Sequence, residues 1–305
     1  MDSKKVELER WPRISVITPS FNQAQFLEQT IQSVLEQDYP NIEYIVIDGG
    51  STDGSVGIIR QYADRLSHWV SEPDRGQAHA INKGFERATG DILCWINSDD
   101  YFFPGVFRQV ADAFANSESP MLVYGMCLMF DAGRGWSELR QPVSPFDRAL
   151  FRTTMFLDQA SSFWTRDLWL KVGPLDEALH YAFDWDWFIR AAERGSFKYV
   201  PLLTSAYRIH RNHKTGSGGG VRRQEIRQIV DRYADSHSRE MYRVVDEKII
   251  PILCRLQWLG RVRGFWRLKR SAELIVPRLL HASVYRNFGS QAVRRAITML
   301  GEPAL

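Results

Sequence analysis

The stretch ILCWINSDDYFFPG, residues 92–105, contains an apolar run that stops abruptly at a polar cluster. The run predicts a buried strand. It ends in Asn97, Ser98, Asp99 and Asp100. Two adjacent carboxylates at the tip of a buried strand repel each other and lose hydration, so we expect a compensating group beside them.

Upstream of this strand, the sequence alternates between strand and helix patterns. Runs rich in β-branched residues predict strands at residues 14–20, 42–48 and 68–70. Apolar residues at helical spacing predict helices at residues 25–37, 55–62 and 78–88. This alternation indicates an α/β fold, with a mostly parallel sheet and helices on its faces.

In sheets of this kind, ligands bind outside the carboxyl ends of the strands. Three polar segments fall at such ends, namely Thr18–Asn22, Asp48–Ser55 and Asn97–Asp100, so we expect them to form one site. A carboxylate such as Asp99 suits Mg²⁺ or Mn²⁺, which take one or two carboxylates and complete their shell with water and phosphate oxygens. Asn, Ser and Asp also cap helices and form turns, which is the plainer interpretation of the same residues.

The second half of the chain mixes strands and helices. Its predicted elements are strands at residues 121–130, 197–200 and 202–210, a strand followed by a helix over 160–173, and a helix over 183–195. TGSGGG, residues 215–220, has the composition of a flexible hinge or lid, and the chain beyond it looks helical. We therefore expect a catalytic domain over residues 1–220 and a helical C-terminal segment over 221–305.

Charge is distributed unevenly along the 305 residues. Residues 1–220 carry 22 Lys and Arg against 28 Asp and Glu, a net charge of −6, whereas residues 221–305 carry 17 against 8, a net charge of +9. The C-terminal segment therefore suits an anionic partner. The three cysteines are spaced neither for a disulfide framework nor for a metal site, which favours a reducing compartment. Since we see no signal-peptide pattern and no membrane-spanning run, we expect a cytoplasmic protein with at most peripheral membrane contact.

Four motifs follow one another in the first hundred residues: ITPSFN (17–22), YIVIDGGSTDGS (44–55), SEPDRGQAHAINKGFERATGDI (71–92) and WINSDD (95–100). Together they resemble the family 2 glycosyltransferases, which are inverting enzymes with the GT-A nucleotide-sugar-binding fold. The bacterial members that build O-antigen, capsule and other surface polysaccharides look most similar. The resemblance covers about residues 13–217. It implies transfer of a hexose-type sugar from a nucleotide donor, expected to be UDP-linked, to a glycan or a lipid-linked saccharide.

The resemblance also implies which residues bind the donor. The residues that match the loop for base and ribose are Thr18, Pro19, Ser20 and Asn22. Asp48 matches the acid that accepts a hydrogen bond from the uracil ring. The residues that match the segment lining the nucleoside and diphosphate are Asp74, Arg75, Gly76 and Asn82. The glycine-rich turn after Asp48 can also cap the next helix through Asp53 or Ser55.

Asn97-Ser98-Asp99 stands where the family has its metal-binding Asp-x-Asp. Asn97 removes one possible ligand charge, so Asp99 carries the metal assignment, Ser98 lines the donor site beside it, and Asp100 is the alternative ligand. His210 matches a histidine that helps to bind the metal or the diphosphate, although a lone histidine often has a structural role. The implied cofactor is Mn²⁺ or Mg²⁺.

An inverting transfer needs a general base, because the acceptor hydroxyl is a poor nucleophile until a carboxylate takes its proton. The family places this base near the start of a helix, six residues before an arginine. Asp184 precedes Arg190 by six residues, so it is the expected base, and Asp186 is the weaker candidate. Capping of the helix by Asp184 is the structural interpretation.

The acceptor is expected beside this helix. The resemblance places Gln159 and Trp164 towards the cleft, and Trp185 would supply an aromatic surface for a sugar. Lys214, Thr215 and the glycines that follow would form a lid over the diphosphate.

Residues 249–272 contain six basic residues and no acidic one. Trp258, Phe265 and Trp266 fall on one stripe of a predicted helix, and a cationic helix with an aromatic face suits an anionic membrane surface. Packing of this stripe on the catalytic domain is the alternative. We expect no nucleic-acid partner, because no recognition module accompanies the charge.

Two other functional classes stay open. A sugar-nucleotide pyrophosphorylase is also an α/β nucleotide-binding enzyme, but it needs a glycine-rich phosphate loop after its first strand, and TPSFNQAQF (18–26) lacks one. The second class is a non-catalytic nucleotide-sugar or glycan-binding protein of the same fold. Donor-dependent release of UDP would separate an enzyme from such a binder.

Overall fold

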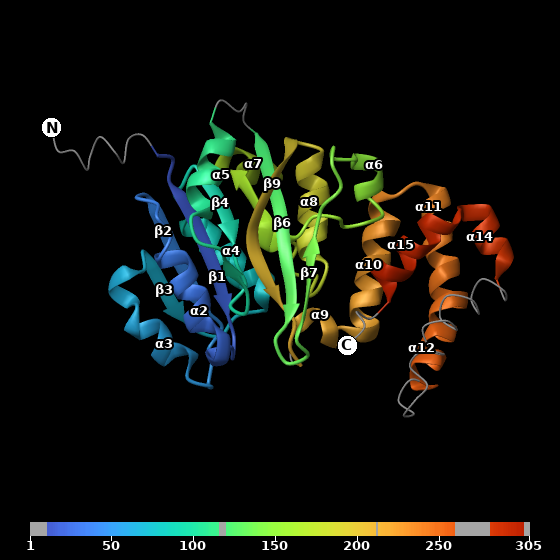
Figure 1. Ribbon diagram of the computed structural model, residues 1–305, viewed down its shortest axis with the longest axis horizontal. Coiled ribbons are helices and arrows are strands. Elements are labelled where there is room, and N and C mark those ends of the chain that lie inside the picture. The colour runs from blue at the N-terminus through green and yellow to red at the C-terminus, as the bar shows by residue number, and fades with distance from the viewer. Residues whose placement is uncertain (1–10, 116–119, 212, 260–280, 302–305) are drawn as a thin grey trace. The chain divides into compact units, whose positions relative to one another are not determined.

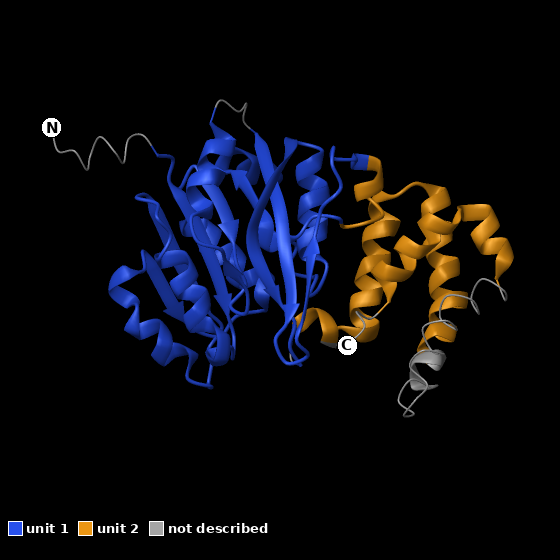
Figure 2. Ribbon diagram, in the orientation of Figure 1, with its two compact units in different colours: residues 1–148, 156–213 blue, residues 149–155, 214–305 orange. Residues whose placement is uncertain are grey.

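The computed structural model describes residues 11–115, 120–211, 213–259 and 281–301. The chain forms two compact units, one of residues 1–148 and 156–213 and the other of residues 149–155 and 214–305 (Figure 2). The first unit contains the sheet, and the described part of the second unit is helical.

The first unit is built on a nine-stranded sheet (Figure 1). Its strands are β1 (Ile14–Ser20), β2 (Ile42–Asp48), β3 (His68–Ser71), β4 (Ile92–Trp95), β5 (Tyr101–Phe102), β6 (Met121–Asp131), β7 (Trp136–Arg140), β8 (Ser162–Thr165) and β9 (Ser196–Arg208). They lie in the order β3-β2-β1-β4-β8-β6-β9-β5, with β7 paired to β6. The first four run parallel, and β8 lies antiparallel between β4 and the parallel pair β6 and β9. The predicted α/β class is confirmed.

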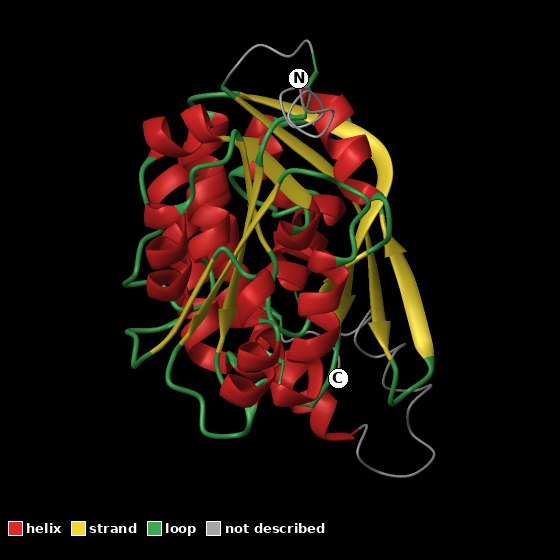
Figure 3. Cartoon of the chain, turned by 90° about the vertical axis from the view of Figure 1, so that its left-hand side faces the viewer, coloured by secondary structure: helices red, strands yellow, loops and turns green. Residues whose placement is uncertain are grey.

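Helices cover both faces of this sheet (Figure 3). They are α2 (Ala24–Leu35), α3 (Ser55–Gln61), α4 (Gln77–Arg87), α5 (Val106–Phe114), α7 (Arg166–Val172) and α8 (Phe183–Ala192). Successive strand residues point to opposite faces, so Ile14 and Val16 of β1 join one apolar core with α2, α3 and α5. Ile17 points the other way, where a Cβ on Gly84 of α4 would lie 2.4 Å from its Cγ2 atom. Glycine at residue 84 therefore lets α4 lie close against β1.

A cluster of buried aromatic rings fixes α8 beneath the end of β4. The rings of Trp95 and Trp164 lie 5.3 Å apart, and those of Trp164 and Trp187 lie 4.8 Å apart. Phe183, the first residue of α8, lies 6.5 Å from Trp95, the last residue of β4. Such pairs add to the stability that burial of the rings provides. The first turn of α8 is thereby held close to the carboxyl end of β4.

One predicted break in the sheet is wrong. The two strands expected at residues 197–200 and 202–210 form the single strand β9, although Pro201 lacks the amide hydrogen that a sheet ladder needs. The pairing with β6 shifts at this point, from Tyr124 opposite Tyr199 to Met126 opposite Leu203. This irregularity accommodates the proline without ending the strand.

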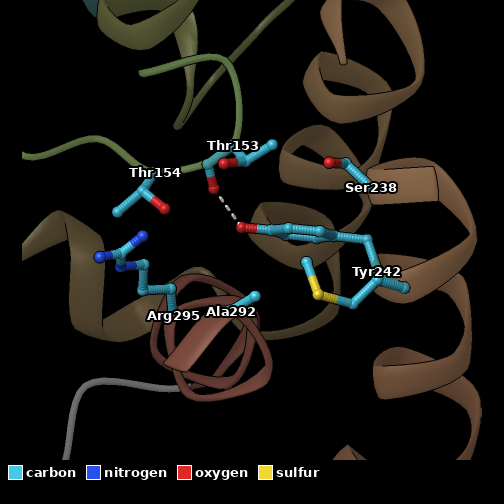
Figure 4. A pocket seen from close by; sticks show the side chains of 7 residues that line it. Thr153, Thr154, Ser238, Tyr242, Ala292 and Arg295 are labelled. Atoms are coloured by element: carbon cyan, nitrogen blue, oxygen red, sulfur yellow. Dashed lines mark hydrogen bonds between the residues drawn. The ribbon is translucent and has the colours of Figure 1, made fainter. Parts of the chain in front are cut away.

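The second unit consists of α6 (Arg148–Phe151), α9 (Lys214–Ser217), α10 (Gly219–Tyr233), α11 (Ser236–Val244), a π-helix (Val245–Ile249), α12 (Ile250–Leu259), α14 (Ala282–Phe288) and α15 (Ser290–Leu300). Residues 215–220, expected to form a flexible hinge or lid, are helical apart from Gly218, which separates α9 from α10. A small pocket of about 70 Å³ lies in this unit, where the Tyr242 hydroxyl donates to the carbonyl oxygen of Thr153 (Figure 4). Within the described residues, no helix has the length and hydropathy to cross a membrane.

A buried carboxylate ties the start of the sheet together. Glu43 accepts hydrogen bonds from the Ser15 hydroxyl (2.5 Å) and from the backbone and hydroxyl of Thr89 (2.7 and 2.8 Å). Arg13 lies 3.4 Å from its Oε1 atom. Burial alone would raise the pKa of Glu43, but these hydrogen bonds and the Arg13 charge outweigh it and hold the pKa below its usual 4.5.

Glu43→Gln is therefore expected to lower the free energy of unfolding at pH 7 by about 2 kcal/mol, because an amide nitrogen replaces an acceptor oxygen among these donors. A depressed folded-state pKa stabilises the protein above the unfolded-state pKa, and this contribution is lost as the pH falls through the folded-state value. The difference between wild type and variant should thus shrink in acid. Urea unfolding at pH 7 and at mildly acidic pH measures it, and equal stability at pH 7 would contradict the assignment.

Candidate active site

The loops after β1, β2 and β3 begin at one level of the sheet. Ser20 lies opposite Asp48, and Asp48 lies opposite Ser71, in the parallel register of the three strands. Strand β4 joins the other side of β1, with Trp95 opposite Ile17. The three polar segments predicted to meet at the carboxyl edge therefore do so.

The loop after β1 divides between core and surface. Thr18 is fully buried, and its hydroxyl shares a 3.0 Å hydrogen bond with the hydroxyl of Tyr44. Pro19 and Ser20 are also buried, and the Ser20 Oγ atom has no hydrogen-bond partner. Asn22 is exposed with a positive φ of 52°, and its side-chain oxygen accepts from the amide of Thr52. Asn22 thus connects the loop after β1 to the loop after β2.

Asp48 organises its own loop. It is fully buried, and its Oδ2 atom accepts from the amides of Gly50 (3.1 Å) and Ser51 (2.9 Å) and from the Ser71 hydroxyl (2.7 Å). Its Oδ1 atom accepts from the Ser51 hydroxyl at 2.5 Å. Four donors therefore fix the orientation of the carboxylate, and the base-binding role expected for Asp48 stays a prediction.

The segment after β3 contains a surface loop and, further on, a buried asparagine that is hydrogen-bonded to another loop. Asp74 Oδ1 accepts from the amide of Gly76 at 2.7 Å, just before α4. The largely exposed Arg75 side chain forms an ion pair with Glu177 at 2.6 Å. Asn82 is buried and bonds to the backbone of Leu175 in both directions. Asp74, Arg75 and Gly76 therefore remain at the site, whereas Asn82 holds the 175–177 loop and faces away from solvent.

The adjacent carboxylates Asp99 and Asp100 lie in different environments. Asp100 is 1% exposed, and its Oδ1 atom accepts from the amide of Arg208 at 2.9 Å. Burial, and then the neighbouring charge of Asp99, raise the pKa of Asp100 well above its usual range. Asp99 remains more accessible, and its Oδ2 atom lies 3.0 Å from Nε2 of His210. The two carboxylates therefore have different partners, Asp100 the backbone of Arg208 and Asp99 the ring of His210.

The end of β9 positions this pair. Strand β5, which follows Asp100, runs antiparallel to β9 and brings Asp99 to His210 across 111 residues of sequence. The Arg208 guanidinium donates to the carbonyl oxygen of Asp99 at 2.9 Å and lies 4.8 Å from the centre of the Phe26 ring. The His210 ring lies 4.5 Å from the same phenylalanine. Arg208 and Phe26 thus hold both members of the pair in place.

These residues fit a divalent cation that is shared with a diphosphate. Among the described residues there is no group of three or more His, Cys, Asp or Glu that could hold a metal alone. Asp99 and His210 would supply two ligands, and phosphate oxygens and water would supply the others, as is usual for cations bound with nucleotides. An imidazole ligand favours Mn²⁺ over Mg²⁺. Asp100, the alternative ligand, does not fit, because it is buried and bonded to the Arg208 backbone.

The middle of the motif is packed beneath this pair. Ser98 is 5% exposed, and its carbonyl oxygen accepts from the hydroxyl of Thr30 at 3.0 Å. Asn97 Oδ1 accepts from the side-chain amide of Gln77 at 2.7 Å. Asn97 therefore links the motif to the first turn of α4, which is a structural use for the residue that replaces the first aspartate.

The two aspartates of α8 have separate roles. Asp186 is 1% exposed and forms an ion pair with Arg190 at 2.8 Å. Arg190 also donates to the carbonyl oxygens of Val172 and Pro174, so this pair anchors α8 to the preceding loop. Asp184 is partly exposed, and its Oδ1 atom accepts from the amide of Trp185 at 2.7 Å. Of the two, Asp184 has the accessibility that a general base requires.

The expected acceptor residues are mostly buried. Trp164 and Trp185 are 0% and 1% exposed, so the structure places neither at a surface that a sugar could reach. Gln159 is 8% exposed, and it donates to the carbonyl oxygen of Trp95 at 2.7 Å while its Oε1 atom lies 3.5 Å from Asn97 Nδ2. Gln159 thus packs against the Asn97-Ser98-Asp99 motif and the end of β4.

Sequence reasoning missed two features of the site. Phe21 is 60% exposed at the end of β1, inside the segment Thr18–Asn22 that was already expected to bind the donor. An aromatic residue in a predicted binding loop was the available signal. The role of Arg208 depends on the β5–β9 pairing, which a two-residue strand does not reveal in sequence.

Comparisons with known proteins identify the family of this chain. The model of the glycosyl transferase family 2 matches residues 15–165. A glycosyltransferase of Mycobacterium tuberculosis is 35% identical over 184 residues, which are 59% of this chain and 69% of that protein. The chain belongs to glycosyl transferase family 2. This glycosyltransferase is therefore an enzyme of the class expected from its motifs.

Solved structures show that the fold is GT-A. The structure of Staphylococcus aureus TarS 1–349 in complex with UDP-GlcNAc matches with a TM-score of 0.57 at 18% identity. The match covers 71% of this chain and 64% of the TarS chain, so it spans less than two thirds of TarS 1–349. The mannosyltransferase PcManGT from Pyrobaculum calidifontis, in complex with GDP-Man and Mn²⁺, matches with a TM-score of 0.51 at 18% identity over 99% of this chain and 81% of that one. The predicted GT-A fold with C-terminal helices is confirmed.

Proposed function

We propose that this glycosyltransferase is an inverting, metal-dependent enzyme that moves a hexose from a UDP-sugar to a glycan or lipid-linked saccharide in surface polysaccharide synthesis. The observation that carries the proposal is the Asp99–His210 pair at the carboxyl end of the parallel strands. The start of α8, with Asp184, packs close to the same strand end through Phe183 and Trp95. The donor and Mn²⁺ in the related complexes support the ligand class.

The donor diphosphate would bind between Asp99, His210 and the loop at residues 74–76. Mn²⁺, when bound, offsets the charge of the leaving diphosphate. Asp99 and His210 would hold the cation, and Arg208 keeps Asp99 oriented through its bond to the backbone. Arg75, just before α4, forms an ion pair with Glu177 and would supply a cation on this loop.

Asp184 would act on the acceptor. Its carboxylate takes the proton of the acceptor hydroxyl while that oxygen attacks the anomeric carbon. The bond from the anomeric carbon to the diphosphate breaks in the same displacement, on the opposite face of the sugar. The configuration at that carbon is therefore inverted.

The test is acceptor-dependent release of nucleoside diphosphate from a panel of UDP- and GDP-sugars, with and without Mn²⁺. We expect release from a UDP-sugar and an inverted product by NMR. Release from GDP-sugars alone would replace UDP in the proposal. Tight donor binding without release, across a panel of saccharide acceptors, would instead favour a binding protein.

We also propose that the enzyme works in the cytoplasm and touches the anionic inner face of the membrane through residues 249–272. The proposal rests on sequence, because residues 260–280 and the side chains of 255–259 lie outside the described residues. Co-sedimentation with anionic liposomes should weaken with salt, since charge is screened over about 8 Å at physiological ionic strength. Phe265→Ser combined with Trp266→Ser should abolish sedimentation at unchanged melting temperature. If the wild type did not bind liposomes and the double variant had a lower melting temperature, packing of the stripe on the catalytic domain would be favoured instead.

A further inference from the structure

We propose that the pocket in the helical second unit binds a tetrahedral oxyanion, either inorganic phosphate or a phosphate monoester, between Arg295 of α15 and the hydroxyl of Thr154. The pocket is lined by the 149–155 segment, α11 and α15 (Figure 4). All of its lining residues belong to the second unit, whereas Asp99, Asp184 and His210 belong to the first. The inference therefore does not rest on the proposed function.

Arg295 gives this pocket its positive charge. The side chain is partly buried, and its guanidinium forms no hydrogen bond or ion pair with any residue that the structure describes. None of the residues that line the pocket is acidic. A guanidinium donates several N–H groups in a planar fork that matches the oxygens of a phosphate group. Arg295 thus supplies an uncompensated charge to a pocket whose other lining residues are neutral.

The Thr154 hydroxyl is the second donor. Its Oγ1 atom is buried and has no hydrogen-bond partner within the described part of the chain. The backbone amide of Thr154 donates to the carbonyl oxygen of Leu150 at 2.9 Å, which fixes the residue in place. Figure 4 shows the polar ends of Thr154 and Arg295 turned towards each other in the pocket. A buried hydroxyl without a partner destabilises a fold, and an oxyanion that accepts from both side chains would remove this penalty.

The other hydroxyl groups of the pocket are already bonded. The Tyr242 hydroxyl donates to the carbonyl oxygen of Thr153, and the Ser238 hydroxyl donates to Asp235 at 2.9 Å. Burial raises the pKa of Tyr242 well above its usual value, so its phenol stays neutral and adds no negative charge. The donors that remain are one guanidinium and one hydroxyl. They suit a ligand that accepts hydrogen bonds and carries negative charge.

The size of the pocket suits a small ion. Its volume of about 70 Å³ exceeds the roughly 10–15 Å³ that a single buried water needs. It is far below the roughly 300–1,000 Å³ of pockets that bind drug-sized ligands. A larger molecule could therefore enter only through a terminal phosphate group. Free phosphate and a phosphate monoester present the same oxygens, so the experiment has to distinguish them.

The test is a calorimetric titration of the full chain with inorganic phosphate, at an ionic strength held constant with sodium chloride. EDTA is present throughout, so that no cation can hold phosphate at Asp99 and His210. The wild type should bind one phosphate per chain. Arg295→Gln should weaken binding by about tenfold or more, the usual effect of a hydrogen bond to a charged group. Its melting temperature without phosphate should match that of the wild type, because no bond within the described residues is lost.

Arg294→Gln is the matched control for this loss of charge. Arg294 is an exposed neighbour on the same helix and does not line the pocket. The variant should bind phosphate as the wild type does.

Thr154→Val separates a ligand donor from a packing role. Valine has nearly the shape of threonine, so without phosphate the melting temperature should stay equal or rise, because an unpartnered hydroxyl is removed. Saturating phosphate should raise the melting temperature of the wild type by mass action, and this rise should shrink in the variant. Glycerol 3-phosphate distinguishes the two sources of the anion. Tighter binding than that of phosphate would assign the site to a monoester, and weaker or equal binding would assign it to the free ion.

Equal affinity of the wild type and Arg295→Gln for phosphate would overturn the inference. Absence of saturable binding in the wild type would do the same. If Thr154→Val kept the whole phosphate-induced rise in melting temperature, the hydroxyl would not be a ligand donor and the site as proposed would be wrong. Sugar transfer is measured separately, so failure of these titrations leaves the proposed function standing.

Discussion

Asp184→Asn is expected to lower kcat by about 10²–10⁴-fold while donor affinity stays nearly unchanged, because the change removes only the capacity to accept a proton. The Asp184 Oδ1 atom accepts from the amide of Trp185, and an asparagine oxygen can accept the same bond. The start of α8 should therefore keep its structure. Steady-state kinetics at saturating acceptor and calorimetric titration of the donor measure the two quantities.

Asp186→Asn is the matched control on the same helix. Asp186 is buried and paired with Arg190, so the change leaves a partly buried guanidinium short of its counter-charge. We expect a lower melting temperature in this variant, with kcat reduced far less than in Asp184→Asn. If Asp186→Asn lost turnover at an unchanged melting temperature while Asp184→Asn stayed active, the base would have to be reassigned.

The sheet from β1 to β4 was predictable because local signals agreed with the tertiary structure. In each strand a β-branched or apolar run ends in polar residues, and each intervening helix has apolar residues on one face. Further along the chain, the pairing partners decided the structure. Pro201 predicted a strand end, but the shifted register with β6 absorbs it. Glycines at residues 215–220 predicted a hinge, but their segment is helical.

For a similar reason, the sequence predicted which segments form the candidate site better than it predicted which of their side chains are exposed. Asp99 follows a recognisable strand whose carboxyl end indicated a binding site, whereas His210, which follows another strand, was assigned through the family resemblance. Burial of side chains around them depends on packing that sequence patterns do not specify. Trp164 and Trp185 show this most clearly, since an aromatic residue near a binding motif can equally face the core. The closeness of Gly49 and Asp74 likewise appears only when two loops are brought together.

Asp99→Asn is expected to abolish the dependence of donor binding on Mn²⁺ and to lower turnover by about 10³-fold or more, since a Lewis acid contributes several kcal/mol to the stability of a charged transition state. Asparagine can still hydrogen-bond to His210, whose Nε2 atom lies 3.0 Å from Asp99, so the local structure should persist. Titration of UDP with and without Mn²⁺ gives a readout that does not depend on turnover. His210→Ala should weaken the Mn²⁺ dependence less, because it removes a neutral ligand and leaves the carboxylate.

Asp167→Asn is a suitable control for this charge change, because Asp167 pairs with Lys171 on the surface of α7. It should leave both the Mn²⁺ dependence and the turnover unaltered. Full activity of the wild type in excess EDTA would remove the metal from the mechanism. Asp99 and His210 would then be a hydrogen-bonded pair that positions the end of β9. The diphosphate charge would have to be offset by protein cations, for which Arg75 after β3 and Arg208 in β9 are the candidates.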